Sequence, residues 1–263
     1  MGLLDKLFGG RLPDIPTPVR ASTAPPSAPD LKWAPFLLGL DIEEVYSIFG
    51  EHLQSVRGGI PHEMFAVIDR KIDRIQTTAQ ELGIAKGVDT ALSTVRARLR
   101  RGAGGDLDDK KPGGLFKENM QTAGLIDNLM GALRKRLDEE KGCRYDVGIY
   151  CGRLSLCARS IGSAALLPPE IGQSRRELYT KEIARAGENL ANILSRGEQS
   201  GVLRRAFTPE EADTLKAIAG MAVTTGESEK PDVTRAIYMG IEQILSVAGF
   251  KSSLNRGSRV PTL

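Results

Sequence analysis

The residues that most often bind metals or act as nucleophiles are scarce in this chain. It has two histidines and three cysteines among 263 residues. His62 is followed by a glutamate, but it lacks the second histidine, four residues on, that a metalloprotease helix requires. Cys143, Cys151 and Cys157 are separated by seven and five residues. At about 100° per residue they do not share one face of a helix. We therefore predict no metal site, and we expect the cysteines to be buried, reduced thiols.

Signatures of nucleophilic catalysis and of cofactor binding are missing as well. The sequence contains no Gly-x-Ser-x-Gly, and no glycine-rich loop is followed by the Lys and Ser or Thr of a phosphate-binding loop. Adjacent carboxylates such as Glu43 and Glu44 point in different directions on a helix, so their spacing alone does not make an acid and base pair. We predict no catalytic residue and no cofactor, which favours a non-enzymatic protein. An enzyme whose site is assembled from scattered residues is an alternative.

Arginines are concentrated near the end of one predicted helix, at Arg96, Arg98, Arg100 and Arg101. Cations at a helix C-terminus are favoured by the helix dipole, which explains the cluster adequately. Contact with phosphate is the alternative. No aromatic residue that could stack on a base is interleaved with these arginines, and the formal net charge of the chain is only +3. A nucleic-acid-associated accessory protein that uses these arginines and the basic tail is therefore a hypothesis that we do not favour.

The elements that must position these side chains are predicted to be helices. Phe, Tyr and Trp together make up only 5% of the chain, which leaves few good strand formers. Alanine, leucine, arginine and glutamate are good helix formers. From residue 41 onwards, apolar side chains recur every three or four positions, which is typical of amphipathic helices. We therefore predict an all-α fold, a multi-helix bundle of about seven helices.

The first predicted unit is a helical hairpin over residues 41–101. Asp41 is predicted to cap a helix that begins this unit. The next helix is expected to stop at Gly83, in the position where a left-handed residue is favoured. A helix over 88–99 then pairs with it through a coiled-coil-like seam.

A larger helical bundle is predicted over residues 115–250, after a flexible loop at 102–114 that is rich in glycine and charge. The clearest helix start in this bundle is at Thr208, because a glutamate three residues later completes a capping box. The expected helices of the bundle cover residues 115–141, 145–161, 174–196, 209–223 and 233–248.

The two ends of the chain differ from its middle. Residues 1–10 are an apolar tip, residues 11–40 a proline-rich tether and residues 251–263 a basic tail. Trp33 and Phe36 are predicted to anchor the proline-rich segment on the helical body, and a contact with another chain is the alternative. If the tip is helical, its large apolar side chains share one side; they are Leu3, Leu4, Leu7 and Phe8.

These features predict a non-enzymatic helical assembly or adaptor protein. The tip would attach to a membrane surface or to a groove on a larger assembly, unless it packs on its own chain. A structural or assembly component of a phage-type particle fits this description, and we expect protein partners or self-association. Since no run of about 18 apolar residues occurs, we expect a cytoplasmic protein, either free, peripheral at the inner face of a membrane, or within a larger particle.

Overall fold

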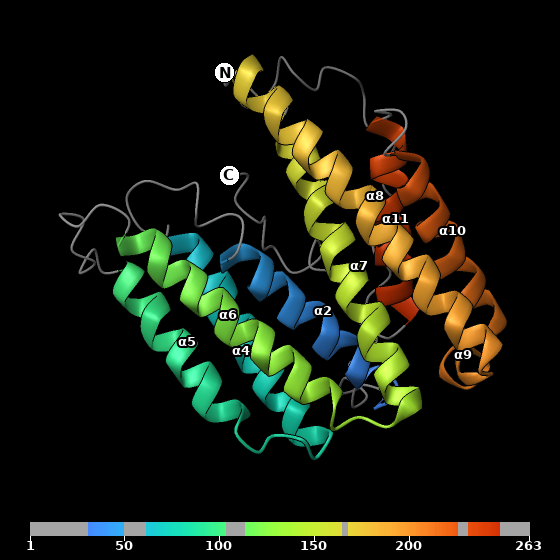
Figure 1. Ribbon diagram of the computed structural model, residues 1–263, viewed down its shortest axis with the longest axis horizontal. Coiled ribbons are helices and arrows are strands. Elements are labelled where there is room, and N and C mark those ends of the chain that lie inside the picture. The colour runs from blue at the N-terminus through green and yellow to red at the C-terminus, as the bar shows by residue number, and fades with distance from the viewer. Residues whose placement is uncertain (1–30, 50–61, 104–113, 165–167, 226–230, 248–263) are drawn as a thin grey trace, which may run out of the picture.

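The computed structural model describes residues 31–49, 62–103, 114–164, 168–225 and 231–247. Within these ranges the chain forms nine helices and no strand, which confirms the predicted all-α fold and exceeds the expected number of helices. The apolar tip, most of the tether and the basic tail lie outside the described residues. The helices are α2 (Ala34–Ser47), α4 (His62–Glu81), α5 (Val88–Ala103), α6 (Gly114–Arg134), α7 (Glu139–Ala164), α8 (Pro169–Gln199), α9 (Val202–Ala206), α10 (Pro209–Thr225) and α11 (Pro231–Val247) (Figure 1).

Helix α2 lies between two groups of helices (Figure 1). All of its residues except Tyr46 are buried. Its most extensive contact is with α7, followed by α4 and α6. Apolar residues occur on every side of this helix, so it is stable only where other helices cover it almost completely.

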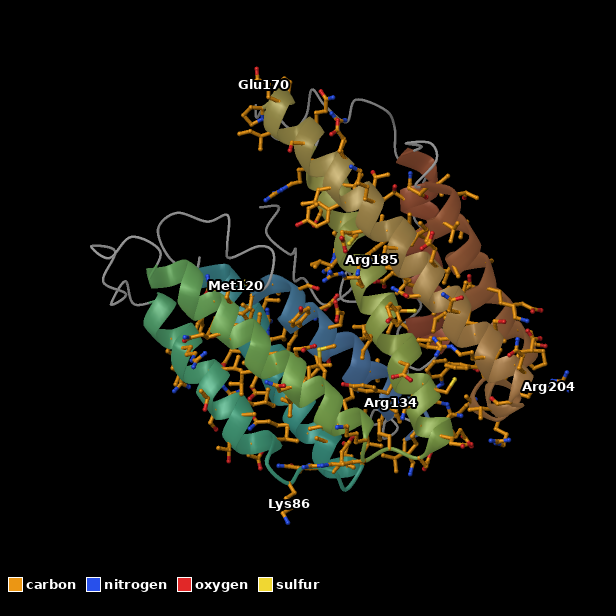
Figure 2. The ribbon with its side chains drawn as sticks, viewed as in Figure 1. Lys86, Met120, Arg134, Glu170, Arg185 and Arg204 are labelled. Carbon is orange, nitrogen blue, oxygen red and sulfur yellow. The ribbon has the colours of Figure 1, made fainter. Side chains whose placement is uncertain are left out.

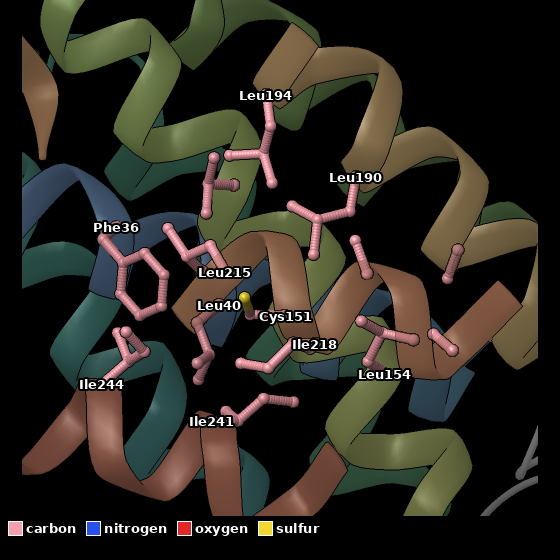
Figure 3. Packing of buried hydrophobic residues seen from close by; sticks show 14 of the residues in the cluster. Phe36, Leu40, Cys151, Leu154, Leu190, Leu194, Leu215, Ile218, Ile241 and Ile244 are labelled. Carbon is pink, nitrogen blue, oxygen red and sulfur yellow. The ribbon is translucent and has the colours of Figure 1, made fainter. Parts of the chain in front are cut away.

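Two hydrophobic cores meet on different sides of α2. The first contains Phe36, Leu37 and Leu40 of α2, together with side chains of α7, α8, α9, α10 and α11 (Figure 3). The second contains Leu38 and Ile42 of α2, together with side chains of α4, α5 and α6. Each core is thus completed by a different face of the same helix.

The two cores do not follow the predicted division of the chain at 102–114. Helix α6 comes after this segment, yet its buried residues, among them Ile126 and Leu133, pack with α4 and α5. An apolar stripe on each helix shows that the helix packs, but it does not show which helix it packs against. The predicted units at 41–101 and 115–250 therefore differ from the grouping of the helices by core.

Helices α2 and α7 approach each other closely because glycines lie at their contact. A Cβ atom on Gly148 would lie 2.0 Å from the carbonyl oxygen of Phe36, and one on Gly39 would lie 2.2 Å from the carbonyl oxygen of Tyr145. Gly152, one turn further along α7, approaches the backbone of α2 in the same way. The distance between packed helices depends on the side chains at their contact, and here backbone meets backbone.

Helix α2 begins at Ala34, so the predicted helix start with Asp41 as its cap is wrong. Pro35 lies in the first turn, where proline is tolerated because its missing N–H has no helical partner. The last residues of the predicted tether over 11–40 therefore belong to the helix. Asp41 lies in the middle of α2 and is buried, which requires cations from other helices that the local sequence does not reveal.

The helix predicted over 115–141 is in fact two helices, because α7 already begins at Glu139. Asp138 caps α7, and its Oδ1 accepts a hydrogen bond from the backbone N–H of Lys141 at 2.8 Å. The apolar pattern continues across the break through Leu137, which is buried. This continuity made two helices look like one in the sequence.

Two predicted helix ends are confirmed. The backbone N–H of Thr208 donates to Oε2 of Glu211 at 2.8 Å, and the N–H of Glu211 donates to Oγ1 of Thr208 at 3.3 Å, as in a capping box. At the end of α4, Gly83 adopts a φ of +70°. The N–H of Ile84 donates to the carbonyl of Ala79 at 2.9 Å, so a left-handed glycine closes this helix.

Replacing Gly148 by alanine is expected to destabilise the fold, because the added methyl group would meet the carbonyl oxygen of Phe36 at 2.0 Å. Helices α2 and α7 would have to move apart, and overpacking of this kind costs about 1–3 kcal/mol. The matched control is Gly131→Ala in α6, where no atom lies within 4 Å of the added Cβ. The control should gain about 0.5–1 kcal/mol from the helix propensity of alanine. Denaturant unfolding followed by circular dichroism measures both, and equal effects would contradict the close contact.

Candidate functional site

Three carboxylates of α2 are buried among cations of neighbouring helices. Asp41, Glu43 and Glu44 are only 4–5% exposed. Lys71 Nζ of α4 lies 3.3 Å from Asp41 Oδ1 and also pairs with Glu44. Arg74 Nε, one turn further along α4, donates to Asp41 Oδ2 at 2.9 Å. These ion pairs hold α4 against α2.

Helix α7 supplies two more cations. Arg159 Nη2 donates to Glu44 Oε1 at 2.6 Å. Arg153 Nη1 donates to Glu43 Oε1 at 3.2 Å, and its Nη2 donates to Glu182 Oε2 of α8, also at 3.2 Å. Arg153 therefore joins α2 to α8 through α7.

Ser47, in the last turn of α2, completes this group. Its hydroxyl accepts a hydrogen bond from Arg153 Nη1 at 2.7 Å and donates one to Glu43 Oε1 at 2.9 Å. Buried ion pairs add little net stability, but loss of one partner is costly because the other charge stays buried. We call the connected group the α2 ion network; it consists of Asp41, Glu43, Glu44, Ser47, Lys71, Arg74, Arg153, Arg159 and Glu182.

The α2 ion network keeps Glu44 ionised. Burial by itself would raise the pKa of Glu44, but the attraction of Lys71 and Arg159 outweighs burial and lowers the pKa to about 2. A carboxyl group with so low a pKa is unprotonated near neutral pH and is unsuited to general acid catalysis. The geometry makes the network a device that fixes α4, α7 and α8 around α2.

The free energy of unfolding is expected to depend on pH through Glu44. Because the pKa in the folded state is depressed, the contribution of Glu44 is complete above its usual value of 4.5 and is lost as the pH falls towards about 2. This loss should amount to about 3 kcal/mol. Glu44→Gln should lower stability at pH 7 and remove this part of the pH dependence.

The control for this substitution is Glu198→Gln, because Glu198 is half exposed and pairs with Lys216 at the surface at 3.0 Å. Removing an exposed pair of this kind changes stability by about 1 kcal/mol or less. Denaturant unfolding between pH 2 and pH 7 compares the variants with the parent chain. A Glu44→Gln profile parallel to that of the parent below pH 5 would show that the pKa of Glu44 is not depressed.

Two of the arginines predicted to contact phosphate are engaged within the chain. Arg96 Nε donates to Asp69 Oδ1 at 2.6 Å, and Arg96 also pairs with Asp73, both on α4. Arg98 Nη1 donates to Thr122 Oγ1 of α6 at 3.1 Å. These arginines join α5 to its two neighbouring helices, and contact with phosphate stays a prediction.

The remaining residues that were predicted to contact phosphate or to attach the chain are either exposed or outside the described part of the chain. Arg100 is exposed on α5. The side chain of Arg101 and the whole apolar tip lie outside the described residues; the tip residues are Leu3, Leu4, Leu7 and Phe8. Their predicted roles stay predictions.

Trp33 and Phe36 lie in the first core, where α2 begins. Trp33 is 3% exposed and Phe36 is fully buried. The Trp33 ring meets Phe36 edge to face at 5.4 Å between ring centres, and it meets Phe207 at 5.9 Å. Such aromatic pairs add to the area that each ring buries. Anchoring of the proline-rich tether by these rings stays a prediction, because residues 11–30 lie outside the described ranges.

The three cysteines are free and buried, as predicted. Burial raises the pKa of Cys151 to about 12. Burial, reinforced by the charge of Asp146, raises the pKa of Cys143 to about 11. Since the thiolate is the nucleophile and the metal ligand, these thiols are weakly reactive near neutral pH.

An exposed apolar and basic face on α8 is the feature that sequence reasoning missed. Ile171 and Leu178 lie seven residues apart on the same side of the helix and are 57% and 56% exposed. Arg175, Lys181 and Arg185 lie on this side as well, with Arg175 partly exposed and the other two exposed. We call these five residues the α8 face.

Figure 2 shows Arg185 on the side of α8 that points away from α10. The spacing of the two apolar residues was a usable signal in the sequence. It was missed because the helix was predicted over 174–196, which excludes Ile171, whereas α8 begins at Pro169.

No helix among the described residues is long and apolar enough to cross a membrane. No protein-family model, no curated protein and no solved structure matches this chain. Its function is therefore inferred from the chemistry and geometry of its own residues.

Proposed function

We propose that the chain is a non-enzymatic helical assembly or adaptor protein. The tip, residues 1–10, attaches it to a membrane surface or to a larger macromolecular assembly such as a phage-type particle. The helical body presents the α8 face to a protein partner. The α8 face is the observation that carries this proposal.

The α8 face combines apolar and basic side chains that the fold does not use. Ile171 and Leu178 are each more than half exposed, and neither belongs to the two cores. Arg175, Lys181 and Arg185 form no ion pair with any residue that the structure describes. Apolar side chains on a helix surface, flanked by uncompensated charge, are typical of a surface that binds another protein.

The charges of the α8 face favour a different protein over a second copy. In an antiparallel pair of two copies centred on Leu178, Arg175 would face Lys181, and Ile171 would face Arg185. In a parallel pair, each cation would face its own equivalent. Both arrangements oppose like charges, which is unfavourable. An acidic amphipathic helix would instead cover the two apolar residues and pair its carboxylates with the three cations.

The α2 ion network supports binding at this face because it fixes α8. Glu182, which follows Lys181 in the sequence, accepts a hydrogen bond from Arg153, and Arg153 also donates to Glu43 of α2. A face on a helix that is already held in place loses little conformational entropy on binding.

The tip provides a second and weaker contact. Its four large apolar side chains contribute about 1.5–3 kcal/mol each when buried, and ordering the segment cancels much of that gain. Attachment becomes firm when the tip and the α8 face bind the same assembly, because the first contact raises the effective concentration of the second.

A photocrosslinking residue placed at Leu178, in the full chain expressed in its native cell, is expected to form a discrete crosslink with another protein. The same residue at Ala217, exposed on α10, is the matched control and should form none. Mass spectrometry should map the crosslink to an acidic amphipathic segment of the partner. Lys181→Glu with Arg185→Glu should abolish the crosslink by charge repulsion and leave the thermal unfolding midpoint unchanged.

Deleting residues 1–10 from the same chain tests the attachment. When the cell lysate is fractionated, the deletion should move the protein from the membrane or high-mass fraction into the fraction of unattached protein. Flotation of the purified full chain with liposomes then separates attachment to lipid from attachment to protein. The proposal fails if crosslinks at Leu178 and Ala217 are alike and the deletion changes neither fraction.

A further inference from the structure

A pocket of about 410 Å³ opens between the end of α7 and the starts of α8 and α11. Apolar atoms form most of its walls, and the residues that line it include Ala158, Ile161 and Gly162 of α7 and Tyr238 of α11. Pockets of this volume hold a drug-sized molecule, which is the size of about two or three large side chains. Because burial removes apolar surface from water, such walls favour an apolar occupant.

Arginines also line the pocket, and Arg159 shows how such a residue contributes to an apolar wall. Its guanidinium group donates to Glu44 Oε1 at 2.6 Å and to the carbonyl of Ser155 at 3.3 Å. These bonds hold the charged end of Arg159 in the α2 ion network, so its carbon chain is the part that remains for the pocket. The carbon chains of Arg176 and Arg235 can cover apolar surface in the same way.

A second hollow, of about 820 Å³ beside the start of α7, is lined by charged residues. Leu31 is the one exception among the described residues that line it. Several of these charges pair with each other. Arg144 lies 3.0 Å from Glu140. Arg205 lies 3.6 Å from Glu139. An apolar segment is therefore suited to the pocket between α7, α8 and α11 and not to this hollow.

The tip, residues 1–10, is the segment whose composition fits this pocket. Its charges, Asp5 and Lys6, are of opposite sign, and four of its side chains are large and apolar: Leu3, Leu4, Leu7 and Phe8. The basic tail over 251–263 fits less well, because it carries three cations and no acidic residue. Cations are costly to bring against an apolar wall.

We propose that the tip of the same chain occupies this pocket while it is not attached to a membrane or to a larger assembly. This inference rests on the proposed role of the tip in attachment. It adds that attachment competes with the pocket for the same apolar side chains. Docking in the pocket keeps these side chains from forming an exposed apolar patch that binds other surfaces indiscriminately.

The tether is long enough for this contact. Residues 11–30 join the tip to the helical body, which begins beside Arg144, where Nη1 donates to the carbonyl of Lys32 at 3.0 Å. From Arg144 to the pocket residues at 158–162, α7 rises by about 21–27 Å. A fully extended, polyproline-like chain of about 20 residues spans about 60 Å. The excess length allows a path around the helices.

Tethering makes a weak contact sufficient. A flexible chain of this length has a root-mean-square end-to-end distance of about 25 Å, which is close to the rise along α7, and prolines lengthen it towards the extended limit. A linker whose length matches the span gives an effective concentration in the millimolar range. A contact with a dissociation constant of about 1 mM is then occupied about half of the time. A membrane or assembly that binds the tip more tightly displaces it.

A photocrosslinking residue at Leu4 of the purified full chain tests the docking. At low protein concentration, irradiation should give a crosslink within one chain, and mass spectrometry should map it to lining residues of the pocket on α7 or α11. A mixture of isotope-labelled and unlabelled chains distinguishes this crosslink from one between two copies. Crosslinks that mainly join labelled to unlabelled chains would overturn the proposal.

Gly162→Phe should fill the pocket and lower the crosslink yield at least about fivefold. Gly162 is exposed on α7, and no atom lies within 4 Å of an added Cβ. A large side chain on a helix points back over the preceding turn, here towards Ala158 in the pocket. Gly131→Phe on α6 is the matched control, because Gly131 is exposed and equally open. The control should leave the crosslink yield unchanged.

Leu7→Ser with Phe8→Ser is the second variant, because it removes apolar side chains from the tip and leaves the described helices unaltered. It should lower the crosslink yield as Gly162→Phe does, so the proposal is tested even if Gly162→Phe destabilises the fold. The proposal is overturned if the crosslink does not map to the pocket, as when residues 165–167 or another part of the chain fill it. It is also overturned if this tip variant keeps the parent yield, or if Gly131→Phe and Gly162→Phe lower the yield alike.

Failure of this proposal and failure of attachment by the tip give different results. If deleting residues 1–10 changes neither lysate fraction while the purified chain forms the crosslink, docking stands and attachment is rejected. If the deletion releases the chain but the crosslink is absent, docking is rejected and attachment stands. If both are correct, Gly162→Phe should raise the attached fraction relative to Gly131→Phe, because the tip is no longer held in the pocket.

Discussion

The buried carboxylates of α2 can remain charged only while cations from α4 and α7 lie against them. Glycines at the contact with α7 bring the two backbones together, so that Arg153 and Arg159 reach Glu43 and Glu44. The same helix contributes apolar side chains to both cores. Close backbone contact, charge compensation and apolar burial therefore all require α2 to stay in one position, and the other described helices are arranged around it.

This constraint extends to the surface features that carry the functional proposals. Arg153 links Glu43 to Glu182, whose neighbours on α8 belong to the exposed apolar and basic face. A partner on α8 would therefore bind next to residues that are fixed from the centre of the molecule. Preorganisation of this kind lowers the entropic cost of binding.

Local signals in the sequence were sufficient for the fold class and for some helix ends. The capping box at Thr208 and the left-handed Gly83 were predictable because each is a bond or a dihedral angle within a few residues. Asp41 was misread as a cap because an acidic residue before an apolar run looks the same whether it begins a helix or lies inside one. Only cations distant in sequence distinguish the two cases.

Native-state hydrogen exchange of the parent chain, measured with increasing denaturant, tests the central position of α2 most directly. If both cores depend on α2, the slowest amides of α2, α4 and α8 should open in one cooperative step with the same free energy. Exchange in which either α4 or α8 opens at lower free energy while α2 stays protected would contradict this. So would faster exchange in α2 than in the helices that cover it.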